Sequence, residues 1–506
     1  MSATQDLSIE ALAGAAKQQP GSPGAQGRLA GALARAGRLP EALAACERAV
    51  ALAAYAPELQ LLRAQLLASL GRASESAAAY GRVAVLRPAD PAAAFNHGLA
   101  LQVAGRAEAA LAEYDRTLAL EPGEPGALSN KAVVLLGLNR PAEALAACDA
   151  AVAADPGFAA AHTNRGLALR ELNRPQEAVE AFDRALSLAP AATEAVCNRA
   201  VCQLLLGDFE VGFTGHERRW DIEPLRSQQR RLGKPLWLGE GDIAGRRLLL
   251  HAEQGLGDTL QFARYARSAA ERGAHVVMEA PAALIPVLRS LEGVETLIPA
   301  GEPLPEFDLH TPMMSLPLAF RTRLETIPAQ PAYLSAPPER VAAWAERLGP
   351  RRAFRIGAVW FGKPTHTNDP NRSIPLAQFA QALPRGVEVI SLHDRMREAD
   401  AAALAAHPEI RRFDAEIADF GDTAALASLV DLVVSVDTSA AHLAGALGRP
   451  TWVLLPFAPD WRWLLEREDS PWYPSFRLFR QPALGDWATV LARLRSAIGD
   501  LAGSER

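Results

Sequence analysis

A period of 34 residues runs through the first half of this 506-residue chain. Glycine or asparagine recurs at one register of the period, and small residues recur at two others. The first register holds Gly37, Gly71, Gly105, Asn139, Asn173 and Gly207. Gly and Asn tolerate the left-handed conformation that ends a helix, and small residues let two helices pack closely. The period therefore predicts a stack of helix pairs.

A two-helix unit of this length and pattern resembles the tetratricopeptide repeat (TPR), and about six such units fit residues 1–227. Stacked units form an α-solenoid, or superhelix, whose concave surface binds peptide or protein segments. Four asparagines recur 34 residues apart on the first helices: Asn96, Asn130, Asn164 and Asn198. Two interpretations stay open for them, a ladder that holds a peptide backbone or hydrogen bonds between helices inside the array.

Composition excludes several classes of protein. With 49% hydrophobic residues, 22% charged residues and a net charge of −6, the chain gives no electrostatic case for binding nucleic acid. No apolar run approaches the ~18 residues of a membrane span, and the N-terminus lacks the basic and apolar regions of a signal peptide. The four cysteines have no metal-binding spacing. We therefore expect a cytoplasmic protein without a metal.

The second half has a different architecture, since all nine tryptophans lie at Trp220 or later. Apolar runs alternate with helical patterns, which is typical of parallel α/β sheets. The expected strands are Arg247–His251, His275–Glu279, Val294–Ile298, Arg355–Trp360, Val387–Leu392, Ile410–Phe413, Leu432–Val436 and Trp452–Leu455. One helix is expected from Leu260 to Gly273 and another from Pro281 to Ser290. A proline-rich stretch from Pro328 to Pro338 divides the pattern, so we predict two lobes, 228–345 and 346–506.

The stretch Leu432–Pro456 predicts a strand, a polar turn at Asp437–Ser439, a short helix and a second strand. In open α/β sheets, ligands bind at the carboxyl ends of the strands. The free N–H groups at the start of the following helix suit a phosphate. An ordinary crossover with a well-capped helix is the alternative interpretation.

Two Rossmann-like lobes in tandem look like the GT-B fold of glycosyltransferases. Gly255–Asp258 (GLGD), Asn371–Pro375 (NRSIP) and Val436–Thr451 resemble motifs of the ADP-heptose:lipopolysaccharide heptosyltransferases. WFGKPTHTND and LLPFAPDWRWL resemble segments of bacterial proteins in which TPR units precede such a domain. Ser439 replaces a glycine of the family, and the tryptophan expected after Arg372 is missing. The fold would be a TPR superhelix followed by a GT-B domain whose last helix, near Trp487–Leu501, returns to the first lobe.

This resemblance implies an inverting glycosyl transfer in which Asp258 is the general base, with Gly255 and Gly257 allowing a tight turn. The alternative for Asp258 is a simple helix cap, and His366 and Asp369 are second candidates for the base. Trp461 and Trp463 are interpreted as packing residues. The predicted nucleotide-sugar-binding residues are Gly255, Gly257, Lys363, Arg372, Asp437, Thr438, Ser439 and His442. No acidic pair is placed to hold Mg²⁺, so we expect transfer without a metal or another cofactor.

The sequence therefore predicts an enzyme that moves a sugar from a nucleotide donor, on the second lobe, to an acceptor at the first lobe. The TPR array would hold a protein acceptor, and flagellin is one acceptor suggested by analogy with TPR-fused flagellin glycosyltransferases. One alternative is a non-catalytic adaptor with a degenerate glycosyltransferase domain. Another is a heptosyltransferase-like enzyme that acts on a cell-surface polysaccharide.

Overall fold

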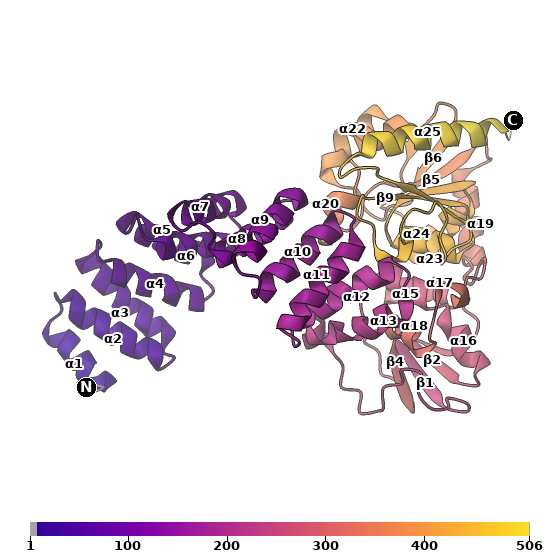
Figure 1. Ribbon diagram of the computed structural model, residues 1–506. Coiled ribbons are helices and arrows are strands. Elements are labelled where there is room, and N and C mark those ends of the chain that lie inside the picture. Colours follow the sequence, from indigo (N-terminus) through magenta and orange to yellow (C-terminus); the bar gives the residue numbers. More distant parts are fainter. Residues whose placement is uncertain (1–7, 505–506) are drawn as a thin grey trace. The chain divides into compact units, whose positions relative to one another are not determined.

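The computed structural model describes residues 8–504 (Figure 1). The first seven residues, on which the expectation of no signal peptide partly depends, lie outside the described part. Contacts divide the chain into two compact units. Unit 1 comprises Met1–Leu169 and Glu180–Ala192, and unit 2 comprises Arg170–Val179 and Thr193–Arg506.

Helices come in pairs from residue 23 to residue 216, after a single helix α1 (Ile9–Gln18). The first helices are α2 (Pro23–Arg35), α4 (Pro57–Ser69), α6 (Pro91–Val103), α8 (Pro125–Gly137), α10 (Ala159–Glu171) and α12 (Thr193–Leu205). The second helices are α3 (Leu39–Leu52), α5 (Ala73–Leu86), α7 (Ala107–Leu120), α9 (Pro141–Ala154), α11 (Pro175–Leu188) and α13 (Phe209–His216). These six pairs confirm the prediction of a TPR solenoid.

The repeat positions have the conformations that the sequence predicts. All six Gly or Asn residues at the turn between paired helices have a positive φ, from 56° at Asn173 to 87° at Gly207. Close packing explains the small residues. A Cβ atom at Gly166 would lie 2.6 Å from the Phe182 ring, and one at Gly98 would lie 2.9 Å from the Tyr114 ring. A larger residue would push the two helices of each pair apart.

Unit 2 contains a first lobe built on a four-stranded parallel sheet of order β3-β2-β1-β4. The strands are β1 (Arg247–His251), β2 (His275–Ala280), β3 (Val294–Pro299) and β4 (Leu309–Pro312). Its helices are α14 (Leu225–Gln228), α15 (Leu256–Phe262), α16 (Tyr265–Glu271), α17 (Ile285–Leu288) and α18 (Leu316–Ala319).

The helix expected from Leu260 to Gly273 is divided between α15 and α16. Arg264 lies at the division, fully buried, and its Nε donates to the carbonyl oxygen of Gln261 at 2.8 Å. A side chain that occupies this carbonyl competes with the backbone bond of a regular helix. The helix expected at residues 281–290 is likewise shorter, with α17 preceded by a turn of 3₁₀-helix (Ala282–Leu284).

The second lobe contains a six-stranded parallel sheet of order β10-β9-β8-β5-β6-β7. The strands are β5 (Arg355–Val359), β6 (Glu388–Ser391), β7 (Ile410–Arg411), β8 (Leu432–Val436), β9 (Thr451–Leu455) and β10 (Phe476–Arg480). Its helices are α19 (Pro338–Leu348), α20 (Asp369–Arg372), α21 (Leu376–Phe379), α22 (Ala401–Ala406), α23 (Phe420–Ser428), α24 (Ser439–Ala446) and α25 (Trp487–Ser504). Figure 1 shows α23 and α24 between the two sheets.

The last helix does not return to the first lobe as expected. The buried side chains of α25 include Val490, Leu494 and Ile498, which share a core cluster with Ile356 of β5 and Val434 of β8. The apolar side of α25 is thus already buried against the sheet of its own lobe.

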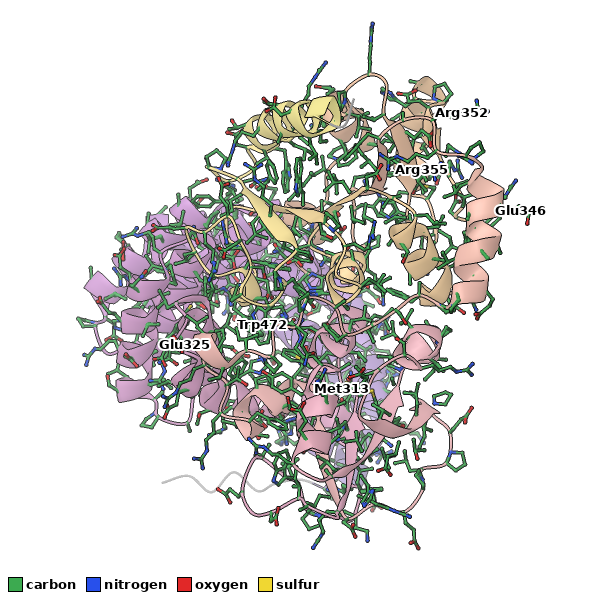
Figure 2. The ribbon with its side chains drawn as sticks, turned by 90° about the vertical axis from the view of Figure 1, so that its right-hand side faces the viewer. Met313, Glu325, Glu346, Arg352, Arg355 and Trp472 are labelled. Atoms are coloured by element: carbon green, nitrogen blue, oxygen red, sulfur yellow. The ribbon has the colours of Figure 1, made fainter. Side chains whose placement is uncertain are left out.

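The last helix pair of the array folds with unit 2. The rings of Phe209 and Phe213 in α13 meet Trp461 edge-on at 6.2 and 5.5 Å, and Phe209 stacks on Trp472 at 5.9 Å. Figure 2 shows Trp472 inside unit 2, between the levels of Arg355 and Met313. The aromatic residues of this last repeat therefore pack against the α/β part of the chain.

Candidate functional site between the two lobes

Helix α15 of the first lobe packs directly against α24 of the second. A Cβ atom at Gly257 would lie 2.8 Å from Cδ2 of His442 and 3.5 Å from the Cα of Ser439. Gly257 is needed for this close approach, and neither it nor Gly255 has a positive φ, so the expected tight turn is not the reason for these glycines. The contact brings together residues 255–258, residues 437–442 and the loops 362–372 and 460–463, which we call the interlobe site.

Asp258 has partners on both carboxylate oxygens. Its Oδ2 accepts from the backbone N–H of Gly255 at 2.8 Å, so it does cap α15. Its Oδ1 accepts from Nη2 of Arg462 at 2.5 Å, an ion pair in which the Asp258 side chain is 22% exposed. Each carboxylate oxygen has two lone pairs, so both can still accept a further hydrogen bond. The two roles proposed for Asp258, cap and base, are compatible in this geometry.

Arg372 lies next to the start of α24. Its Nη1 donates to the carbonyl oxygen of Asp437 at 2.8 Å, and its Nε lies 3.5 Å from Oδ1 of Asp369. Gly362 makes room for it, because a Cβ atom there would lie 2.5 Å from the guanidinium. Nε of Arg372 is enclosed and has no hydrogen-bond partner. Arg372 is thus held beside the free N–H groups of Thr438 and Ser439, where an anion would meet both.

Asp437 is the titratable group at this turn. Burial raises the pKa of Asp437 to about 6, and the neighbouring charge of Asp460 adds to the increase. The indole of Trp463 and the guanidiniums of Arg372 and Arg462 act in the opposite direction. The folded protein therefore holds a proton on this carboxyl at pH values where an unfolded chain does not.

The Asp437→Asn variant should be more stable than the parent above about pH 6. A raised folded pKa gives stability that is complete below the unfolded pKa, near 3.8, and is lost as the pH rises through about 6. The loss is at most about 3 kcal/mol, since one pKa unit corresponds to about 1.4 kcal/mol. Urea unfolding at several pH values measures the difference between the two proteins. It should be near zero at pH 3.5 and largest at pH 7, and a difference independent of pH would contradict the prediction.

The other candidate bases lie in the loop after β5. Asp369 is buried and accepts from Oγ of Ser373 at 2.8 Å, so its carboxylate holds the loop together. The residue His366 is exposed, but its neighbours still desolvate part of its ring, which lowers its pKa; the charge of Arg372 lowers the pKa further, and Asp460, Asp369 and Asp258 oppose the change. Lys363 is exposed on the same loop.

His442 is buried behind the start of α24. Its Nδ1 pairs with the hydroxyl of Tyr473 at 2.9 Å, and its ring stacks on Trp463 at 5.5 Å. Burial, together with the charges of Arg462 and other arginines, holds the pKa of His442 well below its usual value, so the ring is neutral. Trp461 and Trp463 are both buried, as expected of packing residues.

In the array, two asparagines form contacts between helices. Nδ2 of Asn164 donates to Oγ of Ser129 on the preceding first helix at 2.8 Å. In unit 2, Oδ1 of Asn198 accepts from Nη1 of Arg170 at 2.7 Å. Asn96 and Asn130 are half-buried. For Asn164 and Asn198 the structure thus shows hydrogen bonds between helices, the second of the two interpretations.

A ladder of ion pairs that the sequence analysis missed follows the asparagines. Lys131 pairs with Asp115 at 2.5 Å, and Arg165 pairs with Asp149 at 2.7 Å, each 16 residues earlier on the preceding helix. A basic residue directly after each asparagine was the signal. These pairs link one repeat to the next.

The described residues offer neither a metal site nor a membrane span. Within residues 8–504, no group of three or more His, Cys, Asp or Glu residues could hold a metal ion. No helix in this part of the chain has the length and apolar character needed to cross a membrane. The four cysteines are free thiols.

Comparison with known proteins identifies the repeats. Models of the tetratricopeptide repeat match residues 6–57, 61–125, 95–159 and 159–191. Protein FlbA of Caulobacter vibrioides is 29% identical over 333 residues, which are 60% of this chain and 55% of FlbA. The chain thus spans about half the length of this curated relative.

Similar solved structures include YrrB, described as a TPR protein with an unusual peptide-binding site, and MamA. Each is 20% identical, and they cover 37% and 33% of this chain and 97% and 92% of their own, with TM-scores of 0.33 and 0.32. The matches to the repeat models show that tetratricopeptide repeats make up the N-terminal part of this chain, and an α/β part with two parallel sheets follows them.

Proposed function

We propose that this chain is an inverting glycosyltransferase of GT-B fold that transfers a sugar from a nucleoside diphosphate or monophosphate donor without a metal ion. The observation that carries the proposal is the meeting of α15 and α24, where a carboxylate, Asp258, lies across from a helix start flanked by Arg372. Glycosyl transfer needs a base for the acceptor hydroxyl and positive charge for the leaving phosphate. The two lobes supply one each.

The leaving group would bind at the start of α24. The backbone N–H groups of Thr438 and Ser439 and the guanidinium of Arg372 would receive its charge. Lys363 and His366, on the exposed loop, could approach the sugar or its phosphate. His442 would support the turn from behind, because its Nδ1 is taken by Tyr473.

The acceptor in this proposal is a protein segment bound by the TPR array, since such repeats bind proteins. Flagellin is one acceptor that the analogy in the sequence suggests. The proposed location is the cytoplasm, which agrees with four unpaired cysteines.

A non-catalytic adaptor is the second candidate function. It is favoured by one observation, that both oxygens of Asp258 already have partners in the protein. An adaptor would use the TPR array for a partner and would show no donor hydrolysis. Incubation with a panel of nucleotide sugars, followed by analysis for the released nucleotide, separates the two functions.

The Arg372→Ala variant should bind nucleoside diphosphates more weakly than the parent. The loss should be about 1–3 kcal/mol, which is typical of one charge-assisted hydrogen bond. Calorimetry with a panel of nucleoside diphosphates measures it. Arg347→Ala, which removes an exposed arginine paired with Glu416, is the control and should keep the parent affinity. Equal affinity in all three proteins would remove Arg372 from the site.

A further inference from the structure

Three consecutive residues of the second lobe reach three different elements. Trp461, Arg462 and Trp463 form a single turn of 3₁₀-helix, η7, after β9. Trp461 packs against α13 of the last helix pair, and Trp463 stacks on His442 of α24. Arg462, between them, reaches α15 of the first lobe.

Each of the three guanidinium nitrogens of Arg462 donates a hydrogen bond. Nη2 donates to Oδ1 of Asp258 at 2.5 Å, Nε donates to Oε1 of Gln261 at 2.5 Å, and Nη1 donates to Oδ1 of Asp460 at 2.9 Å. Its side chain is 8% exposed and lies over the ring of Trp461 at 4.5 Å. Burial opposes its charge, but Asp460 and Asp258 outweigh burial and raise the pKa of Arg462 above its usual value.

The backbone around η7 is held from several sides. Nη1 of Arg480 donates to the carbonyl oxygen of Leu464 at 2.9 Å, and Nη2 of Arg480 donates to that of Trp463. Leu464 has a φ of 50°, a conformation that a leucine keeps only when its surroundings fix it. The backbone that carries Arg462 is therefore fixed. Its planar guanidinium group sets both the position and the orientation of its hydrogen-bond acceptors.

We propose that Arg462 is a positioning residue for Asp258. It holds the carboxylate in one orientation, while leaving lone pairs free for an acceptor hydroxyl. This inference rests on the proposed function of Asp258 as the base. A base must be held close to its productive geometry, because small displacements reduce the rate.

The first test compares turnover in Arg462→Lys and Arg462→Gln with the parent at saturating donor. Lysine keeps the positive charge but lacks the planar guanidinium with its several N–H donors, so turnover should fall about 10-fold. Glutamine also lacks the charge and should lower turnover about 100-fold. The affinity for nucleotide should stay within about twofold of the parent value, because Arg462 contacts the proposed catalytic base, Asp258, and not the leaving phosphate. Arg467→Lys, at an exposed pair with Asp469 on the same connection, should keep parental turnover.

Two results of this test would overturn the proposal. Parental turnover in Arg462→Lys and Arg462→Gln would show that Asp258 needs no positioning. A loss of nucleotide affinity as large as the loss of turnover would make Arg462 a phosphate contact. Melting temperatures identify any variant that fails to fold.

The second test needs no enzymatic activity. In Asp258→Cys, the adjacent guanidinium should favour the thiolate, so iodoacetamide should react about 10-fold faster than in the double variant Asp258→Cys/Arg462→Gln at pH 7. The native thiols give a low background, since burial raises the pKa of Cys46 and Cys197 to about 11.

Equal alkylation rates would overturn the positioning role whatever the activity of the parent. The two cysteine variants could also differ clearly in alkylation rate while the parent protein processes no donor. That result would reject the glycosyltransferase function but leave the electrostatic link between Arg462 and position 258 in place. The two failures can thus be told apart.

Discussion

A chain that begins at Ser227 should fail to fold, whereas a chain that begins at Ala159, the first residue of α10, should fold and bind nucleotide. The sequence alone suggests the first of these as the natural boundary. The structure places α12 and α13 in unit 2 with the α/β lobes, so the Ser227 chain loses part of its own core. Circular dichroism, thermal unfolding and calorimetry with nucleoside diphosphates compare the two.

The size of the effect follows from the buried surface. Leu204, Leu205, Phe209 and Phe213 are all at most 3% exposed and share one cluster with residues of both lobes. Burying each such side chain contributes roughly 2 kcal/mol, so their removal costs roughly 8 kcal/mol. That is comparable to the total stability of a typical domain, about 5–15 kcal/mol. A soluble, cooperatively unfolding Ser227 chain would contradict this account.

The Ala159 chain also tests the array. It lacks α1 to α9, and under the proposed function it should bind nucleotide as the full chain does but lose transfer to a protein acceptor. Transfer at the parental rate would show that the first nine helices do not bind the acceptor.

The repeat half could be predicted from the sequence because its rules are local. A positive φ at Asn139 needs a residue that tolerates it, and that requirement is visible in the residue itself. The strands β1 and β8 were also predicted with their observed limits, because each is built around three consecutive apolar residues that are buried on both faces of its sheet. Both kinds of pattern depend only on neighbours in the chain.

The elements that the sequence did not predict depend on contacts between residues far apart in the chain. Strand β4 was missed because Leu309–Pro312 is short, contains His and Thr, and ends in proline. Its place in the sheet depends on pairing with β1 and on a bridge from His310 to Leu236, both distant in the sequence. The division between α15 and α16 depends on Arg264, whose guanidinium also donates to the carbonyl oxygen of Trp472, 208 residues away. No local pattern indicates either feature.

The candidate site shows the same contrast. Asp258, Arg372 and the start of α24 were proposed from short motifs, and the structure brings them to one place. Arg462 was not proposed, although it touches Asp258 directly, because the two are 204 residues apart and the arginine lies between two tryptophans expected to be packing residues. A buried arginine in an aromatic segment was the available signal.

The Asp258→Asn variant should lose turnover by about 10² to 10⁴, the usual contribution of a positioned base. Asparagine can still accept from the Gly255 N–H and cap α15, but it cannot take the acceptor proton. Loss of the ion pair with buried Arg462 should lower the stability by about 1–3 kcal/mol, because Asp460 is then the one remaining carboxylate in an ion pair with that cation.

A matched variant separates the proton transfer from the ion pair. Asp460→Asn also removes one carboxylate from Arg462, at a comparable distance, 2.9 Å against 2.5 Å, but leaves Asp258 in place. It should lose similar stability and keep turnover within about 10-fold of the parent, because the base remains. If Asp258→Asn and Asp460→Asn lose turnover equally, the effect comes from Arg462 and not from a base, and His366, the exposed candidate on the neighbouring loop, is the next residue to replace.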